Sequence, residues 1–239
     1  MKFKFYHTLG CQERAWVQVS VIFAEVESHE EKEALEGGWL LEDKVWYQTR
    51  STRLRCSEFK SKKKWPDGYS FEIGDHADFN AEEMNAVYQA YIAHCGFSNY
   101  ANHLSYDMDR SKFGVVKKDG RIVAFTKFCI YNGGIGSDIF CWDYSDPKVS
   151  LGIAIQAKEV EYAMSLGNEF IYLGPGYERG CQYKARFPGF EWWSGTEWSS
   201  DVEEYKRLCE RDSAVLTDDV VDKFKVLIDE EVRTCKGKS

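Results

Sequence analysis

The chain has 239 residues, of which 44% are hydrophobic and 15% aromatic, and this composition predicts a folded protein with a substantial core. A net charge of −8 argues against a protein that coats DNA, and no apolar run is long enough to span a membrane. The eight cysteines form no C-x-x-C pair and the five histidines do not cluster. We therefore expect reduced thiols in a cytoplasmic protein, with no metal site.

The charge is distributed unevenly along the chain. Residues 50–64 carry seven basic residues and one acidic residue, whereas residues 201–231 carry eleven acidic and five basic residues. A basic strip on an acidic protein indicates local contact with phosphates, and a solvated basic loop is the alternative. The candidate phosphate-binding residues in this strip are Arg50, Arg53, Lys62, Lys63 and Lys64.

The first part of the chain is predicted to be rich in strands. Alternating apolar residues predict a strand over residues 16–26, and a short acidic helix follows over 29–37. Two more strands are expected at 39–47 and 53–59. Because Trp65-Pro66-Asp67-Gly68 is a strong turn signal, we place a domain boundary there and predict a β-rich N-terminal region over residues 1–66.

A helix and three strands are predicted next. Asn80 can cap a helix over residues 81–95, with Glu82 and Glu83 in the first turn where the helix dipole favours acids. Residues 113–116 and 121–131 flank a Lys-Lys-Asp-Gly turn and predict a hairpin. A further strand is expected to end at Trp142.

Residues 150–198 are the richest in candidate functional residues. Apolar residues at helical spacing follow Ser150 and end at Gly167, and a short strand is predicted over 170–173. The break Gly174-Pro175-Gly176 then leads to a polar cluster and to an aromatic strand over 190–198. We predict one domain over 67–198 and a C-terminal extension over 199–239, with helices near 200–211 and 217–234.

This order of elements is similar to that of an N-acyltransferase domain of the GNAT type. The similarity implies an α+β fold: a GNAT-like, mixed and mostly antiparallel sheet flanked by helices, with a small N-terminal β-rich subdomain and C-terminal helices. In such a domain the acyl donor lies where two strands splay apart. Gly152 and Ala154 match the GNAT phosphate-binding turn, whereas Val149 stands where that turn has a basic residue.

Residues 142–198 resemble the C-terminal domain of arginyl- and leucyl-tRNA–protein transferases more specifically. That family shows a Tyr-Asp-Pro corner, Ser-Leu-Gly at the start of a helix, Tyr-Leu-Gly-Tyr, Tyr-Lys-Ala-Arg-Phe and a final Trp. The matching segments here are Trp142-Asp143 with Pro147, Ser150-Leu151-Gly152, Tyr172-Leu173-Gly174, Tyr183-Lys184-Ala185-Arg186-Phe187 and Trp198. Upstream, Gly38-Trp39, Trp46-Tyr47 and Arg53-Leu54-Arg55 resemble the same family more thinly, and its N-terminal cysteine cluster is missing.

The resemblance implies transfer of an amino acid, arginine above all, from aminoacyl-tRNA to an amine. The acceptor is either a protein N-terminus or a small amino acid or second aminoacyl-tRNA, as in the similar arginine-containing cyclodipeptide synthases. Because the ester on the tRNA is already activated, positioning, deprotonation of the amine and stabilisation of an oxyanion suffice, and we expect no cofactor.

The implied site residues follow from the same segments. Asp143 and Glu178 are candidates to accept a proton or hold a guanidinium, with a turn cap and a solvated charge as alternatives. Aromatic stacking is typical of single-stranded RNA ends, so Tyr172 and Tyr177 are candidates to stack the terminal adenine or to donate a hydrogen bond to the ester carbonyl. The remaining candidates are Tyr183 for catalysis, Gly174 for close backbone approach, and Lys184 and Arg186 for phosphate contact.

Two other functions remain open at this point. A GNAT acetyltransferase would use acetyl-CoA, although Val149 weakens its phosphate turn. A non-catalytic module that binds tRNA or a peptide would keep the fold without the chemistry. Cys181 has no histidine near it in the sequence, so covalent catalysis by this thiol is disfavoured.

Overall fold

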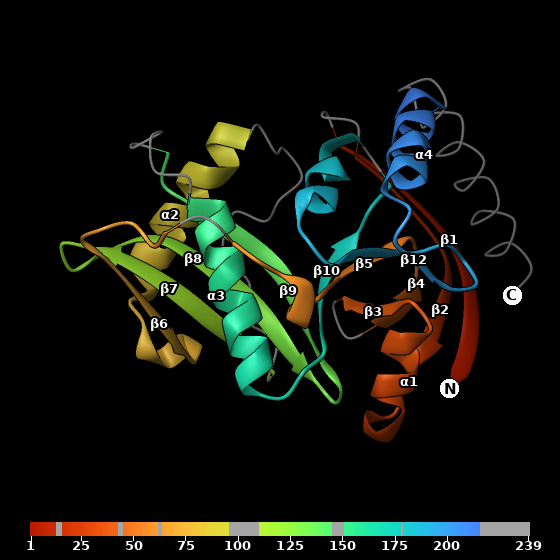
Figure 1. Ribbon diagram of the computed structural model, residues 1–239, viewed down its shortest axis with the longest axis horizontal. Coiled ribbons are helices and arrows are strands. Elements are labelled where there is room, and N and C mark those ends of the chain that lie inside the picture. Colours follow the sequence, from red (N-terminus) through yellow and green to blue (C-terminus); the bar gives the residue numbers. More distant parts are fainter. Residues whose placement is uncertain are drawn as a thin grey trace, which may run out of the picture.

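A computed structural model describes residues 1–12, 16–42, 45–61, 64–95, 110–144, 151–177 and 179–215. The described chain forms two sheets with helices against them (Figure 1). The smaller sheet has the order β1-β2-β4-β3 and the larger one the order β12-β11-β5-β10-β9-β8-β7-β6. Every strand pair is antiparallel except β9 with β10, which is parallel. The predicted mixed, mostly antiparallel α+β fold is therefore confirmed.

The smaller sheet comes from the start of the chain and α1 packs beside it. Its strands are β1 (Lys2–Gln12), β2 (Trp16–Glu25), β3 (Trp39–Glu42) and β4 (Val45–Gln48), and the short helices before β3 are η1 (Ser28–Glu30) and α1 (Glu31–Glu36). Leu35 of α1 is fully buried in one cluster with Trp39 and Trp46. Residues 39–47, which the sequence predicts as one strand, form the β3–β4 hairpin instead.

The larger sheet takes its strands from residues 51 to 199. Its strands are β5 (Ser51–Arg55), β6 (Tyr69–Gly74), β7 (Ser111–Lys118), β8 (Arg121–Tyr131), β9 (Gly134–Trp142), β10 (Phe170–Pro175), β11 (Phe190–Trp193) and β12 (Trp198–Ser199). The 3₁₀ helix η2 (Cys56–Glu58) follows β5, and η3 (His76–Asp78) follows β6. Strand β5 lies inside the predicted region 1–66, yet it pairs with β10 and β11 in the centre of this sheet.

Helices cover both faces of the larger sheet. Helix α2 (Ala81–Cys95) packs Met84 and Val87 against Phe125 of β8, while α3 (Leu151–Ser165) packs Leu151 and Ile155 against the preceding residue of β8, Ala124. Because successive strand residues point to opposite faces, these two helices lie on opposite sides of the sheet. Figure 1 shows α3 crossing in front of β8 and β9.

The C-terminal part is more compact than the sequence suggests. The predicted polar loop after β10 is a 3₁₀ helix, η4 (Arg179–Arg186), and the predicted aromatic strand is the hairpin β11–β12. Helix α4 (Val202–Val215) buries Tyr205 and Cys209 fully in the core beside Phe190. The helix predicted over 217–234 lies outside the described residues.

Helix α2 has the predicted bounds, and its predicted cap is present. The Oδ1 atom of Asn80 accepts hydrogen bonds from the backbone N–H groups of Glu82 (3.0 Å) and Glu83 (3.1 Å). Two amides that would otherwise have no partner within the helix are thereby satisfied.

Replacing Asn80, the cap of α2, should lower the stability of the protein measurably. We expect Asn80→Ala to lower the free energy of unfolding by about 1 kcal/mol, since the two amides lose their acceptor. Asn80→Asp keeps an acceptor and should unfold like the parent. Urea unfolding of the three proteins, followed by circular dichroism, measures this difference; equal midpoints for parent and Asn80→Ala would contradict the role of the cap.

Candidate active site

Strands β9 and β10 lie side by side over a very short distance. Their register contains two pairs, Ile135 with Ile171 and Gly136 with Tyr172. Beyond these pairs β9 continues to Trp142 along β8, whereas β10 continues to Pro175 beside Ser51 of β5. The two parallel strands therefore splay apart toward their carboxyl ends, as the GNAT-like order of elements predicts. We take this splay as the centre of the candidate site.

A buried carboxyl group lies where the strands part. Glu159 of α3 is 2% exposed, and its carboxyl accepts hydrogen bonds from Thr126 Oγ1, from Ser137 Oγ (3.4 Å) and from Gln156 Nε2 (2.9 Å). Ser137 is the first residue of β9 after the last pair with β10. All three donors are neutral, so burial dominates and raises the pKa of Glu159 to about 7.

Sequence reasoning missed this residue, although a signal existed. Glu159 stands four residues after Ile155 and four before Ala163, both buried, so it interrupts the apolar face of α3. A carboxyl at a core position of a helix indicates a group that is hydrogen-bonded or protonated there, because burial of an unpaired charge is costly.

The buried carboxyl predicts a specific dependence of stability on pH. With a folded-state pKa of about 7 against an ordinary 4.5, the folded protein keeps a proton that the unfolded chain loses. Its stabilising contribution is complete below pH 4.5 and is lost as the pH rises toward 7, by roughly 3 kcal/mol. Glu159→Gln cannot ionise, so we expect its stability relative to the parent to rise by that order between pH 4.5 and 8.

Urea unfolding at a series of pH values measures this difference. Glu161→Gln changes an exposed carboxyl of the same helix and serves as the control, which should track the parent throughout. A pH profile of Glu159→Gln parallel to the parent would contradict the assignment.

The predicted catalytic residues follow the two splayed strands. Asp143 comes directly after β9, and its backbone N–H donates to the carbonyl of Val123 (2.8 Å). Tyr183 lies on η4 after β10, 53% exposed and edge-on to Phe187 at 6.5 Å between ring centroids. Because β9 and β10 are parallel, the segments that follow them leave the sheet at the same edge. Glu178 lies outside the described residues.

Tyr172 is a core residue. It is 1% exposed, its ring closes on Gly134 and stands edge-on to Trp198, and burial raises its pKa to about 12 although Arg53 opposes that rise. A ring enclosed on every side offers no face to an adenine. We therefore do not carry Tyr172 forward as a stacking residue.

Lys184 secures the end of β10. Its buried ammonium donates to the carbonyls of Leu173 (2.6 Å) and Pro175 (2.7 Å), on either side of Gly174. Gly174 has a φ of +77°, which favours glycine, and its own carbonyl accepts from Thr52 Oγ1 (2.8 Å). The predicted phosphate contact of Lys184 would require these two hydrogen bonds to break, so we read Lys184 as a residue that shapes the backbone of the site.

The first two basic residues of the strip point inward. Arg50 is 9% exposed, pairs with Asp212 (2.8 Å) and stacks on the ring of Tyr177 at 4.7 Å. Arg53 pairs with Glu191 (2.6 Å). Its guanidinium lies between the rings of Phe170 and Trp198, at 3.6 and 4.0 Å from their centroids.

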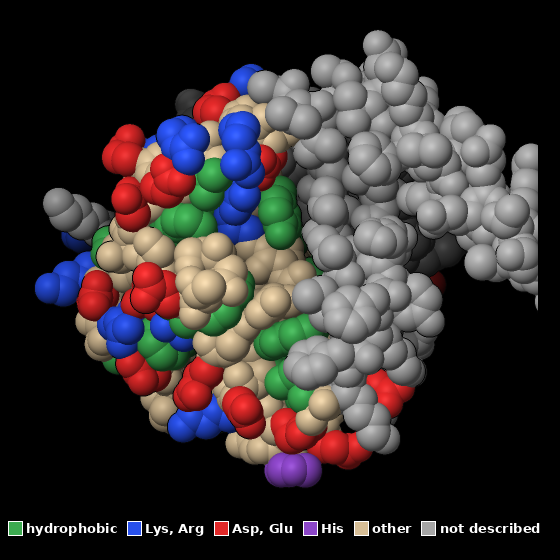
Figure 2. All heavy atoms as spheres, turned by 90° about the vertical axis from the view of Figure 1, so that its right-hand side faces the viewer, with side chains coloured by type: hydrophobic (Ala, Val, Ile, Leu, Met, Phe, Trp, Pro, Cys, Tyr) green, Lys and Arg blue, Asp and Glu red, His purple; other side chains and the backbone are tan. Residues whose placement is uncertain are grey.

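Among the described residues of the strip, Lys60 and Lys64 are exposed, whereas Lys62 and Lys63 lie outside the described residues. Arg186 of η4 is exposed as well. On the described part of the face in Figure 2, acidic and basic side chains are intermingled and no large patch has one sign.

Removing Arg53 should destabilise the protein strongly. Arg53→Ala removes one of the two cations of Glu191, which keeps its pair with Arg55 (2.8 Å), and opens a gap beside two aromatic rings. Breaking a buried ion pair costs about 3–5 kcal/mol, and because Arg55 remains we expect a loss near the lower end of that range in urea unfolding. Arg207→Ala removes an exposed arginine paired with Glu204 and should change stability little. Similar losses for the two variants would contradict the structural role of Arg53.

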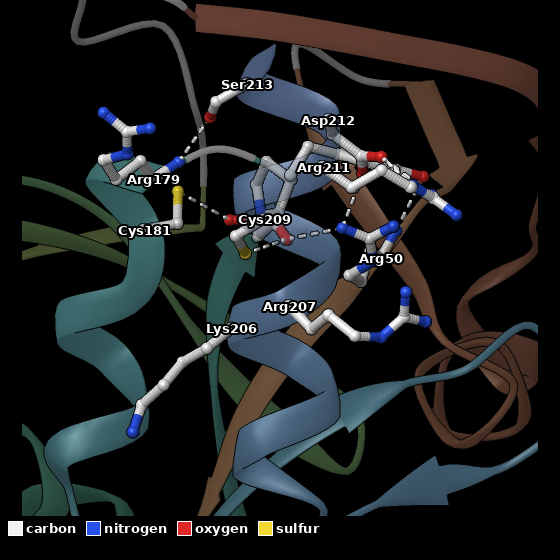
Figure 3. A network of polar contacts seen from close by, with 12 residues as sticks. Arg50, Arg179, Cys181, Lys206, Arg207, Cys209, Arg211, Asp212 and Ser213 are labelled. Atoms are coloured by element: carbon white, nitrogen blue, oxygen red, sulfur yellow. Dashed lines mark hydrogen bonds and ion pairs between the residues drawn. The ribbon is translucent and has the colours of Figure 1, made fainter. Parts of the chain in front are cut away.

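Helix α4 fastens the segment that leaves β10. Cys209 Sγ donates to the carbonyl of Gly176 (3.4 Å), and Asp212 holds Arg50, whose backbone N–H donates to Tyr177 Oη (3.0 Å). Figure 3 shows Arg50 pointing toward Asp212 and the start of η4 facing Ser213, whose hydroxyl accepts from the N–H of Arg179 (2.8 Å). The helix that the sequence assigns to packing alone thus positions one wall of the candidate site.

A second hollow lies at the other end of the strands. It is lined by residues that include Glu31, Arg110, Lys112 and Asp75. Arg110 pairs with Glu31 and Lys112 with Asp75 (2.6 Å), so its charges are paired within the protein. Among the described residues, no cluster of His, Cys, Asp or Glu could hold a metal, and no helix could cross a membrane.

Comparisons with known proteins yield solved structures of similar fold. The chain matches no protein-family model, and a search of curated proteins finds no similar sequence. The C-terminal domain of a protein described as a lysylphosphatidylglycerol synthetase of Agrobacterium fabrum is 19% identical, with a TM-score of 0.44 over 54% of this chain and 46% of that one. The L-PGS of Bacillus licheniformis is also 19% identical, with a TM-score of 0.40 over 54% and 46%.

A third similar structure is a GCN5-related N-acetyltransferase of Kribbella flavida, 18% identical with a TM-score of 0.36 over 54% of this chain and 48% of that one. The chain thus spans about half the length of these three proteins. The fold assignment rests on the strand order of the chain itself, and the activity is a matter for proposal.

Proposed function

We propose that this protein is an aminoacyl-tRNA-dependent aminoacyltransferase that moves an amino acid, most specifically arginine, onto an amine. The observation that carries the proposal is the meeting of the family-like segments around β10. Lys184 of the Tyr-Lys-Ala-Arg-Phe segment binds the backbone on both sides of Gly174, which ends Tyr-Leu-Gly. Trp198 covers Arg53 and stands edge-on to Tyr172. Segments scattered through the sequence thus build one wall of the strand splay.

The geometry supports a mechanism based on positioning. An α-amine attacks the ester carbonyl between the amino acid and the terminal adenosine, a peptide bond forms, and the tRNA hydroxyl leaves with a proton. Asp143, at the open edge after β9, is our candidate to take the proton from the amine or to hold the guanidinium of arginine. Tyr183, exposed on η4, is our candidate to donate a hydrogen bond to the developing oxyanion.

The acceptor divides the proposal into two branches. A protein N-terminus would make the enzyme a conjugating transferase, whereas a small amino acid or second aminoacyl-tRNA would make it a biosynthetic enzyme. We propose Lys64 and Arg186, which are exposed, for contact with tRNA phosphates, with Lys62 and Lys63 from outside the described residues.

A CoA-dependent acetyltransferase is the second candidate. The observation in its favour is the parallel β9–β10 pair that splays after two residue pairs, because this geometry suits either acyl donor. The family-like segments around β10 favour the tRNA donor.

The direct test supplies charged tRNA and follows where the amino acid goes. The protein is incubated with a pool of tRNAs charged with labelled amino acids, with and without cell extract, and with acetyl-CoA in parallel. Label on protein supports the conjugating branch, and a dipeptide or cyclic dipeptide without extract supports the biosynthetic branch. Acetyl transfer without deacylation of tRNA above background would replace the proposal by the second candidate.

The proposed base gives a sharper prediction. Asp143→Asn keeps the shape of the side chain and removes the proton acceptor, so we expect turnover of charged tRNA to fall about 10²- to 10⁴-fold while tRNA binding stays unchanged. Asp67→Asn, a change in the exposed turn before β6, is the matched control and should retain full turnover. Single-turnover deacylation measures both, and a fully active Asp143→Asn would remove Asp143 from the mechanism.

A further inference from the structure

A run of aromatic rings lines the edge of β9 where β10 has turned away. The ring centroid of Trp142 lies 4.7 Å from that of Phe140 and 4.5 Å from that of Tyr144. From α2, the ring of Tyr91 approaches Trp142 at 5.3 Å. The imidazole of His94 lies almost parallel to Tyr144, with 3.5 Å between centroids and 13° between planes.

The run leads from half-buried rings to an exposed one. Phe140 lies at its inner end, where a Cβ added to Gly152 in the first turn of α3 would stand 3.4 Å from the ring. Trp142 and Tyr144 are half-buried, and His94 is exposed. Rings that only fill a core are enclosed on all sides, whereas this run ends in an exposed ring already aligned for further stacking. Such a platform is typical of proteins that bind unpaired bases.

Its position in the fold agrees with that use. Trp142 ends β9, and β9 has no partner on the side of β10 after Gly136 in the described register. Helix α3 begins against Phe140. The platform therefore stands at the opening between the splayed strands, beside Asp143, which is the proposed base.

We propose that the exposed ring of His94, held parallel to Tyr144 behind it, is a stacking platform for an adenine ring. The inference rests on the proposed function for the source of that adenine, which is the 3′-terminal adenosine of tRNA. Coenzyme A carries the same base and is the other source of this chemistry. The sequence assigns adenine stacking to Tyr172, which is enclosed, and to Tyr177, which Arg50 covers; in the structure His94, supported by Tyr144, is the candidate for this role.

The test compares two tRNAs that differ by one nucleotide. Equilibrium binding of uncharged tRNA is measured with its complete CCA end and with the terminal adenosine removed, and CoA is measured in parallel. The proteins are the parent, His94→Ala, Tyr144→Leu and Tyr144→Phe. His29→Ala, which changes another exposed histidine in η1, is the matched control.

We expect removal of the adenosine to weaken parent binding roughly ten- to hundredfold, which is the usual effect of losing one stacked base. His94→Ala and Tyr144→Leu should weaken binding of the complete tRNA to the same extent and abolish the difference between the two tRNAs. Tyr144→Phe keeps the ring and should bind as the parent does, as should His29→Ala.

The other outcomes separate the two proposals. If the parent binds both tRNAs equally well, the platform is overturned while the proposed function stands. If CoA binds in a manner that depends on His94 and tRNA does not bind, the platform stands and the proposed function is overturned. Binding of neither ligand overturns both.

Discussion

Two residue pairs join β9 to β10, and the arrangement of the described chain depends on how short this pairing is. Beyond these pairs, β9 continues to pair with β8 and β10 continues to pair with β5. The larger sheet therefore opens between β9 and β10, while the strands on each side of the opening stay hydrogen-bonded. The opening has α3 on one side and the aromatic residues of β9 at its edge. A longer parallel pair would join β9 and β10 along their length and close the sheet between them.

Three buried cations stabilise the wall of this opening. Arg50, Arg53 and Lys184 are all buried; the two arginines join segments far apart in the sequence by ion pairs, and Lys184 joins η4 to the end of β10 by hydrogen bonds to carbonyls. A guanidinium satisfies a carboxylate and stacks on rings at the same time, which suits a crowded junction of strands.

The sequence predicted local structure well and long-range pairing poorly. Helix α2 and the β7–β8 hairpin were predictable because Asn80, the apolar face of α2 and the Asp119-Gly120 turn act within a few residues. The strip at 50–64 was assigned to phosphates because Asp212 and Glu191, which neutralise Arg50 and Arg53, lie more than a hundred residues away. Glu159 escaped notice since only the fold brings Thr126 and Ser137 to it. The splay itself was predictable only through a resemblance in the order of elements.

The contact between α4 and the turn before β5 has a consequence for how the chain reaches its final form. Arg50 emerges from the ribosome long before Asp212, so the β-strands can pair while the turn at Arg50 still lacks its partner. Only when α4 has been synthesised and has packed does the backbone at Gly176 gain its bond from Cys209. Completion of the wall therefore belongs to the last stage of biosynthesis, when α4 brings Tyr205 and Cys209 into the core and Asp212 to Arg50.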